Sequence, residues 1–406
     1  HTRTDDSVLR LVDAGGRRPA FLRRSRGYVP GALALPEPAP RPLLACGAEL
    51  KNTFCLAKGR RAWVGHHIGD LENYETLRSF SEGIEHFERL FAVEPRICAY
   101  DLHPEYLSTK YALEREGVEL VGVQHHHAHL AACLAEHGET GPALGAIYDG
   151  TGFGADGTVW GGELLIGGLG GFERAGHLRP VPLPGGAAAI REPWRMACAW
   201  LIEAEGSEPG LPAALEPSVE RRDWRNCCRL IEQRLGSPAT TSMGRLFDAV
   251  GALCGAAARV NYEGQAAIEL EAMSDPTEAG AYEMPLLAGI NDSGGASPLV
   301  LDPRPAVGAV LSDLRAGTSP PRAAARFHNT VAGATSAACV ELAGWAGVEL
   351  IVLSGGVFQN RLLLERTAST IESAGLRVLI PEHLPPNDGG VSFGQAAVAA
   401  ARAQCR

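Results

Sequence analysis

The chain has 406 residues, of which 45% are hydrophobic, and a formal net charge of −10 at pH 7. This length predicts two or three domains around a large buried core. The acidic balance argues against nucleic acid as the main ligand, because binding a phosphate backbone needs a basic face. No apolar run reaches the roughly 18 residues that span a bilayer, and we recognise no signal peptide, so we expect a cytoplasmic protein without membrane contact.

The first part of the chain shows no regular pattern. Residues 1–30 are basic and irregular, and residues 31–42 are rich in Pro, Ala and Gly. We predict a solvated tail followed by a linker. From Leu43 an apolar strand, a polar turn over 47–52 and a returning strand follow.

A similar unit recurs about a hundred residues later. It has a strand over 143–148, a glycine-rich turn over 149–154 and a second strand over 158–166. A buried strand over 350–353 then runs into the glycine-containing segment 354–357. Backbone N–H groups of such turns bind anions, and glycine lets the backbone approach closely. Two units in two halves predict a duplicated α/β fold, as in actin-like ATP-binding proteins with the nucleotide between two lobes.

Helical patterns separate these strands. Residues 74–91 carry apolar side chains at helical spacing, and residues 245–258 are similar. Residues 392–401 are mostly small and also predict a helix. The ten cysteines form no Cys-x-x-Cys pair, so no zinc ribbon is expected, and we interpret most of them as buried free thiols. They are Cys46, Cys55, Cys98, Cys133, Cys198, Cys227, Cys228, Cys254, Cys339 and Cys405.

The densest group of chemically active residues is the histidine run at 125–129. It precedes an apolar helical segment, so His125 and His129 would lie at i and i+4 on one helix face. Neutral imidazole is the commonest metal ligand, and this spacing lets both rings reach one ion. The alternative is a run of partly exposed histidines without a metal. His126 and His127 would point elsewhere and either contact a phosphate or do nothing.

Two carboxylates could complete a metal site. Asp149 ends an apolar strand, and Asp388 precedes the predicted C-terminal helix. The alternative role for Asp388 is helix capping alone. Two histidines with two aspartates would make an open site suited to Fe(II), Zn²⁺ or Mn²⁺, with room for water or a phosphate oxygen.

Nucleotide-binding candidates come from three segments. Gly355, Gly356 and Asn360 follow a strand and open a helix, whose N-terminus favours an anion. Gly150 and Gly152 belong to the glycine-rich turn of the other unit. Asp248 could accept hydrogen bonds from ribose hydroxyls, although an ordinary acid near a helix start is an equal alternative.

Together these motifs resemble the HypF carbamoyltransferases of [NiFe]-hydrogenase maturation. The resemblance covers about residues 40–400 in the family's order, and residues 1–8 with 26–30 resemble the end of the family's YrdC-like domain. We therefore divide the chain into a YrdC-like tail with its linker (1–38), a first actin-like lobe (39–140) and a second lobe with inserted helical segments (141–406). The segments that carry the resemblance begin at Gly47, Gln124, Asp149, Trp160, Thr241, Tyr262, Ser354 and Asn387.

The resemblance implies an actin-like ATP-binding fold with two RNase H-like halves around a nucleotide cleft, shared with the TsaD-type tRNA threonylcarbamoyltransferases. It implies one divalent metal, iron or zinc, and ATP or carbamoyl adenylate as the nucleotide, with Mg²⁺ as a further candidate ion. Lys51 would lie in the phosphate region, and Lys51 and His126 are the catalytic candidates. The implied metal ligands are His125, His129, Asp149 and Asp388, and the implied nucleotide residues are Asp248 and the 354–360 turn.

In this family carbamoyl phosphate and ATP give carbamoyl adenylate, and the carbamoyl group passes to the C-terminal cysteine of the partner HypE. The family's acylphosphatase domain, zinc fingers and complete YrdC-like domain are not recognised here. A short form could therefore act on carbamoyl phosphate, or hydrolyse it, directly. The alternatives are a small-molecule O-carbamoyltransferase, a tRNA-modifying enzyme and a nucleotide-binding scaffold without turnover. The sequence does not indicate an oligomeric state.

Overall fold

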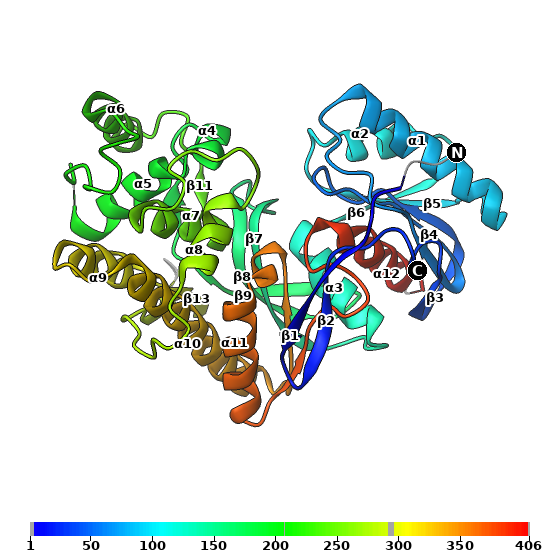
Figure 1. Ribbon diagram of the computed structural model, residues 1–406. Coiled ribbons are helices and arrows are strands. Elements are labelled where there is room, and N and C mark those ends of the chain that lie inside the picture. Colours follow the sequence, from blue (N-terminus) through cyan, green and yellow to red (C-terminus); the bar gives the residue numbers. More distant parts are fainter. Residues whose placement is uncertain (1–3, 207, 291–295, 405–406) are drawn as a thin grey trace.

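The computed structural model describes residues 4–206, 208–290 and 296–404. Figure 1 shows two lobes, with the N-terminal hairpin in front of the region where they meet. The hairpin pairs two antiparallel strands, β1 (Val8–Asp13) and β2 (Arg17–Arg23). The segment His1–Arg3, which belongs to the family resemblance, lies outside the described residues.

The first lobe is a four-stranded sheet in the order β4-β3-β5-β6, covered by two helices. Asn73 caps the long helix α1. On the apolar face of this helix, Phe80 and Phe87 pack edge-on against Phe54, which directly precedes β4. The elements are β3 (Leu33–Ala45), β4 (Cys55–Val64), α1 (Tyr74–Phe91), β5 (Ile97–Asp101), α2 (Leu107–Leu113) and β6 (Glu119–Val123).

The second lobe is built on a nine-stranded sheet. Its main path runs β12-β13-β9-β8-β7-β14-β15, and β10 and β11 join beside β8. The strands are β7 (Ala143–Phe153), β8 (Val159–Gly167), β9 (Phe172–Leu178), β10 (Val181–Pro182), β11 (Ala239–Thr240), β12 (Leu286–Ile290), β13 (Ala296–Leu301), β14 (Leu350–Ser354) and β15 (Arg377–Leu379). The helices are α4 (Ala187–Arg191), α5 (Trp194–Glu205), α6 (Arg221–Glu232), α7 (Met243–Leu253), α8 (Gln265–Met273), α9 (Arg304–Arg315), α10 (Pro320–Ala346) and α11 (Arg361–Ser373).

Two helices lie between the sheets and join the lobes. They are α3 (His125–Glu136) and α12 (Val391–Gln404), and both are buried over most of their length. Their side chains share one core with β3 of the first lobe and with β7 and β14 of the second. A Cβ on Gly394 would lie 1.9 Å from the Ala128 carbonyl oxygen, so the two helix backbones almost touch. This close packing holds the start of α3 against both lobes.

Four predictions about local structure are wrong. The predicted tail over 1–30 is not irregular where it is described, because Val8–Arg23 form the β1–β2 hairpin, and residues 31–42 are not a linker, because β3 begins at Leu33. The predicted turn over 149–154 is largely strand, because β7 resumes pairing with β8 at Gly152 after a bulge. The helix predicted over 245–258 ends at Leu253, where Gly255 takes a φ of +86°.

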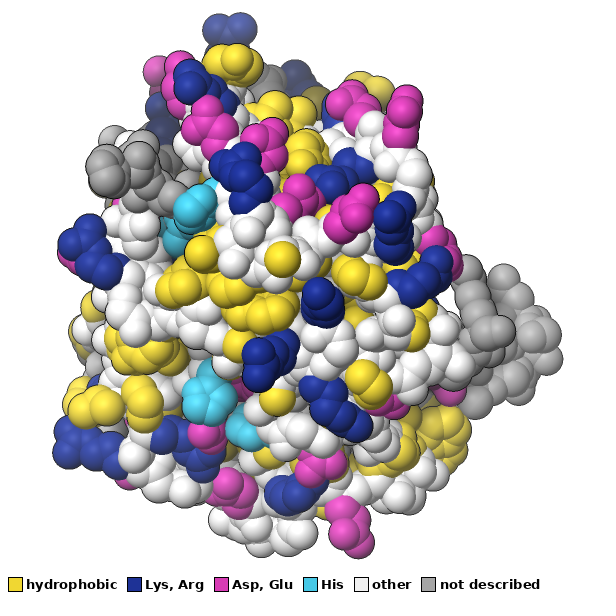
Figure 2. Space-filling model, turned by 90° about the vertical axis from the view of Figure 1, so that its right-hand side faces the viewer, with side chains coloured by type: hydrophobic (Ala, Val, Ile, Leu, Met, Phe, Trp, Pro, Cys, Tyr) yellow, Lys and Arg dark blue, Asp and Glu magenta, His cyan; other side chains and the backbone are white. Residues whose placement is uncertain are grey.

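Other predictions agree with the described residues. Helix α1 has the predicted bounds, and nine of the ten cysteines are buried free thiols. Cys405 lies outside the described residues. Among the described helices, none combines the length and apolar character of a membrane-crossing segment. On the first-lobe face in Figure 2, basic and acidic side chains are interspersed around a band of hydrophobic ones.

Candidate metal and nucleotide site

The two predicted histidines project together from the first turn and a half of α3. Gln124 caps this helix, since its side-chain oxygen accepts a hydrogen bond from the His127 N–H at 2.9 Å. The rings of His125 and His129 lie 4.9 Å apart, and both are almost fully buried. The predicted i, i+4 geometry is therefore present, inside the protein rather than at its surface.

Both predicted aspartates meet these histidines. Asp149 lies at the bulge of β7, and Asp388 lies in a short 3₁₀ turn, Asp388–Gly390, just before α12. His129 Nε2 is 2.9 Å from Asp149 Oδ2, and His125 Nε2 is 3.5 Å from Asp388 Oδ1. One donor atom from each of the four residues lies within 4.8 Å of the others. The capping residue of this turn is Asn387, so capping does not explain the position of Asp388.

The donor atoms of this cluster fit a divalent metal. Nε2 of His125, Nε2 of His129 and Oδ2 of Asp149 are buried and face one another, and outside the cluster they have no hydrogen-bond partner among the described residues. Burial alone would lower the pKa of His125, but the charges of Asp388 and Asp101 raise that pKa well above its ordinary value. The cluster therefore favours positive charge at its centre, which a bound cation supplies. Two imidazoles and two carboxylates are ligands of zinc, iron or manganese.

Sequence reasoning missed Asp101. Its Oδ2 lies 2.8 Å from Nδ1 of His125, and its side chain is fully buried at the end of β5. A carboxylate on one ring nitrogen fixes the ring's orientation and makes the other nitrogen a better ligand. One feature of the sequence could have indicated Asp101. It stands at the end of an apolar strand, in the same position as Asp149.

A cavity of about 640 Å³ opens beside the histidine–aspartate cluster. Asp149 and Asp388 lie on its wall, so a bound molecule can reach the cluster directly. The wall also includes five other predicted residues, which are Lys51, Gly150, Asp248, Gly356 and Asn360. Residues that the sequence placed in separate motifs therefore surround one space.

Two acidic and basic pairs line this cavity. Asp248 is buried with its Oδ2 2.8 Å from Nη2 of Arg245, and burial raises the pKa of Asp248 to about 6. Lys51 pairs with Glu263 of the second lobe, and this contact connects the two lobes across the cavity wall. Burial would lower the pKa of Lys51, but Glu263 raises it to about 12, so the amine stays charged.

Asn360 has a fixed orientation on the cavity wall. Its side-chain oxygen accepts from the Leu363 N–H at 3.0 Å and so caps α11. Its amide nitrogen lies 2.8 Å from Nε2 of buried His328, and Nδ1 of His328 lies 2.8 Å from the Ala324 carbonyl oxygen. The carbonyl can only accept, so Nδ1 of His328 donates and Nε2 accepts from Asn360.

Three of the predicted catalytic and nucleotide-binding residues, Gly152, Gly355 and His126, do not line the cavity. A Cβ on Gly152 would lie 2.4 Å from a carbon of the His126 ring, and one on Gly355 would lie 2.2 Å from the Tyr148 carbonyl oxygen. These two glycines make room for neighbouring protein groups. His126 is fully buried, and burial lowers its pKa well below the ordinary range. The geometry gives no support to the predicted ligand or catalytic roles of these residues.

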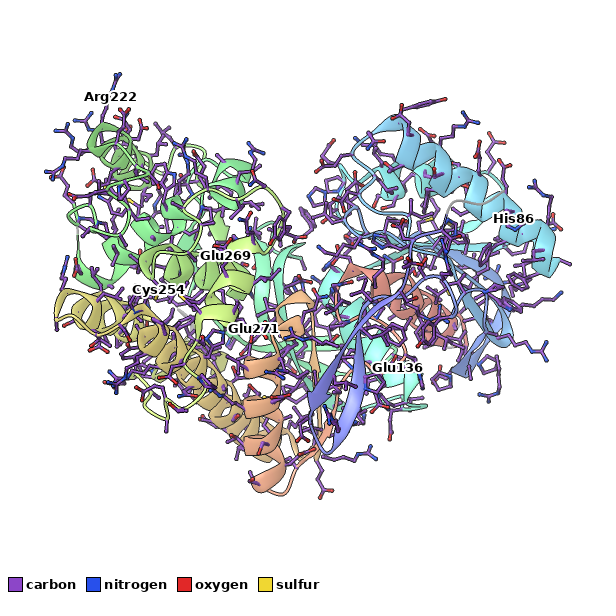
Figure 3. All side chains as sticks on the ribbon, viewed as in Figure 1. His86, Glu136, Arg222, Cys254, Glu269 and Glu271 are labelled. Carbon is purple, nitrogen blue, oxygen red and sulfur yellow. The ribbon has the colours of Figure 1, made fainter. Side chains whose placement is uncertain are left out.

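The N-terminal hairpin contributes a second group that the sequence did not predict. Arg10 lines the cavity, with Nη2 2.8 Å from Glu271 Oε1 and Nη1 2.8 Å from the Gln359 carbonyl oxygen. Leu22 also lines the cavity. Because residues 1–30 show no regular sequence pattern, nothing local points to either side chain. Glu271 lies on α8, as labelled in Figure 3.

Comparisons with known proteins agree with the architecture. The family described as "HypF Kae1-like domain" matches residues 38–136, and the family described as "Carbamoyltransferase, Kae1-like Domain, second subdomain" matches residues 145–395. Carbamoyltransferase HypF2 of Cupriavidus necator is 42% identical over 428 residues, which cover 99% of this chain and 51% of that protein. A shorter relative from the same organism, named a carbamoyltransferase HypF homolog, is 36% identical, and the match covers 88% of this chain and 91% of the relative.

Solved structures show the same relationship. A crystal structure of full-length HypF in the phosphate- and nucleotide-bound form has a TM-score of 0.91 and 38% identity, over 98% of this chain and 51% of that one. HypF of T. kodakarensis has a TM-score of 0.88 and 31% identity, over 99% of this chain and 52% of that one. The chain spans about half the length of these relatives, and the expected two-lobed, actin-like α/β fold is confirmed. The chain belongs to the HypF family of carbamoyltransferases.

Proposed function

We propose that this chain performs the carbamoyl-transfer step of [NiFe]-hydrogenase maturation. One observation carries the proposal. A single cavity has the two aspartates of the histidine–aspartate cluster on one part of its wall and four of the predicted nucleotide residues, Gly150, Asp248, Gly356 and Asn360, on other parts. A carbamoyl adenylate has its carbonyl carbon next to its phosphate, so a site for this substrate must bind a nucleotide beside a group that polarises the acyl centre.

The proposed ligands of the metal are His125, His129, Asp149 and Asp388, and the ion is iron or zinc. When bound, the ion stabilises negative charge that develops on carbonyl or phosphate oxygen. The orphaned donor atoms of the cluster support this assignment. In the same proposal Asp248 accepts ribose hydroxyls, the turn after β14 faces the nucleotide, and Lys51 offers a cation to its phosphate.

The chemistry needs no nucleophile from this chain. A thiolate, proposed to come from the C-terminal cysteine of HypE, attacks the carbamoyl carbon. A C–S bond forms, the bond from that carbon to the phosphate oxygen breaks, and AMP leaves with the electron pair. None of the nine described cysteines lines the cavity, which agrees with an external acceptor.

The test is incubation of the chain with carbamoyl adenylate and purified HypE, followed by mass spectrometry of HypE. We expect the mass of HypE to increase by one carbamoyl group. Full-length HypF is the positive control, and His129→Ala is the inactive control. An unmodified HypE, in a reaction where full-length HypF succeeds, would refute the proposal.

A second candidate is direct action on carbamoyl phosphate, without adenylation. The shorter HypF homolog of Cupriavidus necator supports this candidate. The match covers 91% of that relative, so a family member of about this length exists. The same assay with carbamoyl phosphate and no ATP distinguishes the two. Release of inorganic phosphate that depends on His129 would support this candidate, and dependence on carbamoyl adenylate would exclude it.

A further inference from the structure

The far end of α3 carries a buried carboxylate that the proposed chemistry does not use. The Glu136 side chain is completely buried, and it accepts three backbone hydrogen bonds from consecutive residues. The N–H of Glu382 donates at 2.6 Å, that of His383 at 3.2 Å and that of Leu384 at 3.1 Å. Figure 3 labels Glu136 in the part of the molecule where α3, α12 and the N-terminal hairpin meet.

The partners of Glu136 are unusual for a buried acid. Among the described residues no lysine or arginine lies within ion-pair distance of it, and His137 Nε2 lies 3.6 Å from its Oε1. Cys133, Glu136 and His137 offer donor atoms within 4.8 Å of one another, as a metal site would. However, Glu136 is engaged by three N–H groups, and His137 Nε2 donates to the Ile380 carbonyl oxygen at 2.9 Å. This group therefore holds backbone rather than a second ion.

The backbone it holds leads directly to the proposed metal ligand Asp388. The segment starts near His137 at Ile380, passes Glu136 at 382–384 and reaches the histidines at Asp388. It thus runs back along α3, from the end of the helix to its beginning. On the helix, Glu136 is seven residues after His129, which is two turns along the same face.

The lengths show why an anchor matters. Two turns of helix span about 10 Å, whereas the eight residues from Ile380 to Asp388 could extend over about 26 Å. Without a fixed point, residues 380–388 are long enough to place Asp388 in many positions. From Leu384 only four residues remain, which reach at most about 13 Å. Pro385 and Pro386 also have restricted φ angles, and the Pro386 carbonyl accepts from the Gly355 N–H at 3.0 Å.

We propose that Glu136 is a positioning residue for the metal centre: it fixes the 382–384 backbone so that Asp388 reaches the histidines. This inference rests on the proposed metal centre. Helix α3 would then supply the ligands His125 and His129 directly. Through the hydrogen bonds of Glu136 it would also fix the position of the third ligand, Asp388. Outer residues of this kind typically change metal affinity by about 10–100-fold when they are lost.

The test is a series at Glu136 with Zn²⁺ alone as the probe, competed against a chromophoric chelator. Glu136→Met keeps an unbranched side chain of similar length and removes both acceptor atoms, and it should weaken zinc binding by about 10–100-fold. Glu136→Gln keeps one acceptor oxygen and should lie between Glu136→Met and the unchanged protein. Asp302→Asn is the matched control, because Asp302 is a buried carboxylate that accepts the Arg304 N–H away from the loop.

The metal-free melting temperature separates positioning from general stability. If Glu136 only stabilises the fold, its variants will melt earlier but keep the zinc affinity of the unchanged protein, and the inference is overturned. If Glu136→Met does not fold, His137→Phe keeps an aromatic ring but removes the bond to Ile380 and the contact with Glu136, and it should still weaken zinc binding. His129→Ala distinguishes the two proposals. If His129→Ala still binds zinc normally, both the metal centre and the role of Glu136 are refuted. If His129→Ala loses zinc binding but Glu136→Met binds zinc normally, only the role of Glu136 is refuted.

Discussion

At the residue scale, Asp248 is a cavity carboxylate whose charge changes near neutral pH. Burial raises its pKa to about 6, even with Arg245 beside it. The ionised carboxylate accepts two ribose hydroxyl bonds better than the protonated acid does. Nucleotide affinity measured by calorimetry should therefore fall as the pH drops below about 6, by up to about tenfold for each pH unit.

Stability should change in the opposite direction. The folded pKa of Asp248 lies above the ordinary value of 3.8. Its contribution to stability is therefore complete below about pH 4 and is lost as the pH rises through about 6. Asp248→Asn should remove both effects. If this variant keeps the acid loss of nucleotide affinity, another group is responsible.

His129 and its neighbours make a second prediction at this scale. His129→Ala removes one of two nitrogen donors from a buried cluster, and it should reduce bound metal, measured by elemental analysis, from about one ion per chain to near zero. His86→Ala is the control, because His86 lies on α1 of the first lobe, as labelled in Figure 3. Equal metal contents in the two variants would contradict the assigned ligands.

At the scale of elements, the contact of α3 with α12 predicts a large effect from one methyl group. Gly394→Ala places a Cβ about 1.9 Å from the Ala128 carbonyl oxygen, and the helices must separate. We expect a loss of about 2–3 kcal/mol in unfolding free energy, measured by urea denaturation.

The matched control is Gly344→Ala in α10. Among the described residues, no neighbouring atom lies within 4 Å of the position that the new methyl group would take, and Gly344 lies in the last turn of the helix, where alanine is a better helix former than glycine. This variant should be unchanged or up to about 1 kcal/mol more stable. Similar losses in both variants would show that the close helix contact is not the cause.

The elements also show which patterns can be read from sequence. Helix α1 was predicted correctly because an apolar stripe runs between a capping Asn73 and a left-handed Ala92. The β1–β2 hairpin was missed because Leu9 and Leu11 face solvent, so its strands lack a strong buried alternation. The bulge of β7 looked like a turn because its glycines are equally typical of turns.

At the scale of the whole molecule, the proposed metal ligands come from three separate segments: α3, β7 and the loop before α12. Binding one ion should therefore stabilise the packing between these segments. Removing the metal with a chelator should lower the melting temperature, and at a hundredfold excess of metal over its Kd the lost stabilisation is about 2.7 kcal/mol. An unchanged melting curve in the chelated protein would contradict a metal centre at this position.

The whole-molecule view also explains which site residues the sequence could indicate. Residues in compact motifs, such as His125, His129 and the 354–360 turn, were visible as local patterns. Asp101, Glu263 and Arg10 were not, because their roles depend on contacts with residues far away in the chain. Single-sequence patterns indicate which side chains can do chemistry, but long-range packing decides which of them meet.

The order of residues in the proposed centre has a consequence for biosynthesis. Its first ligand is residue 125, and its last, Asp388, follows every strand of both sheets. The last ligand therefore leaves the ribosome only after all of these strands, so strong metal binding should require the segment around residue 388. Nascent chains stalled before residue 388 should therefore bind zinc at this cluster only weakly, because one of the four proposed ligands is absent.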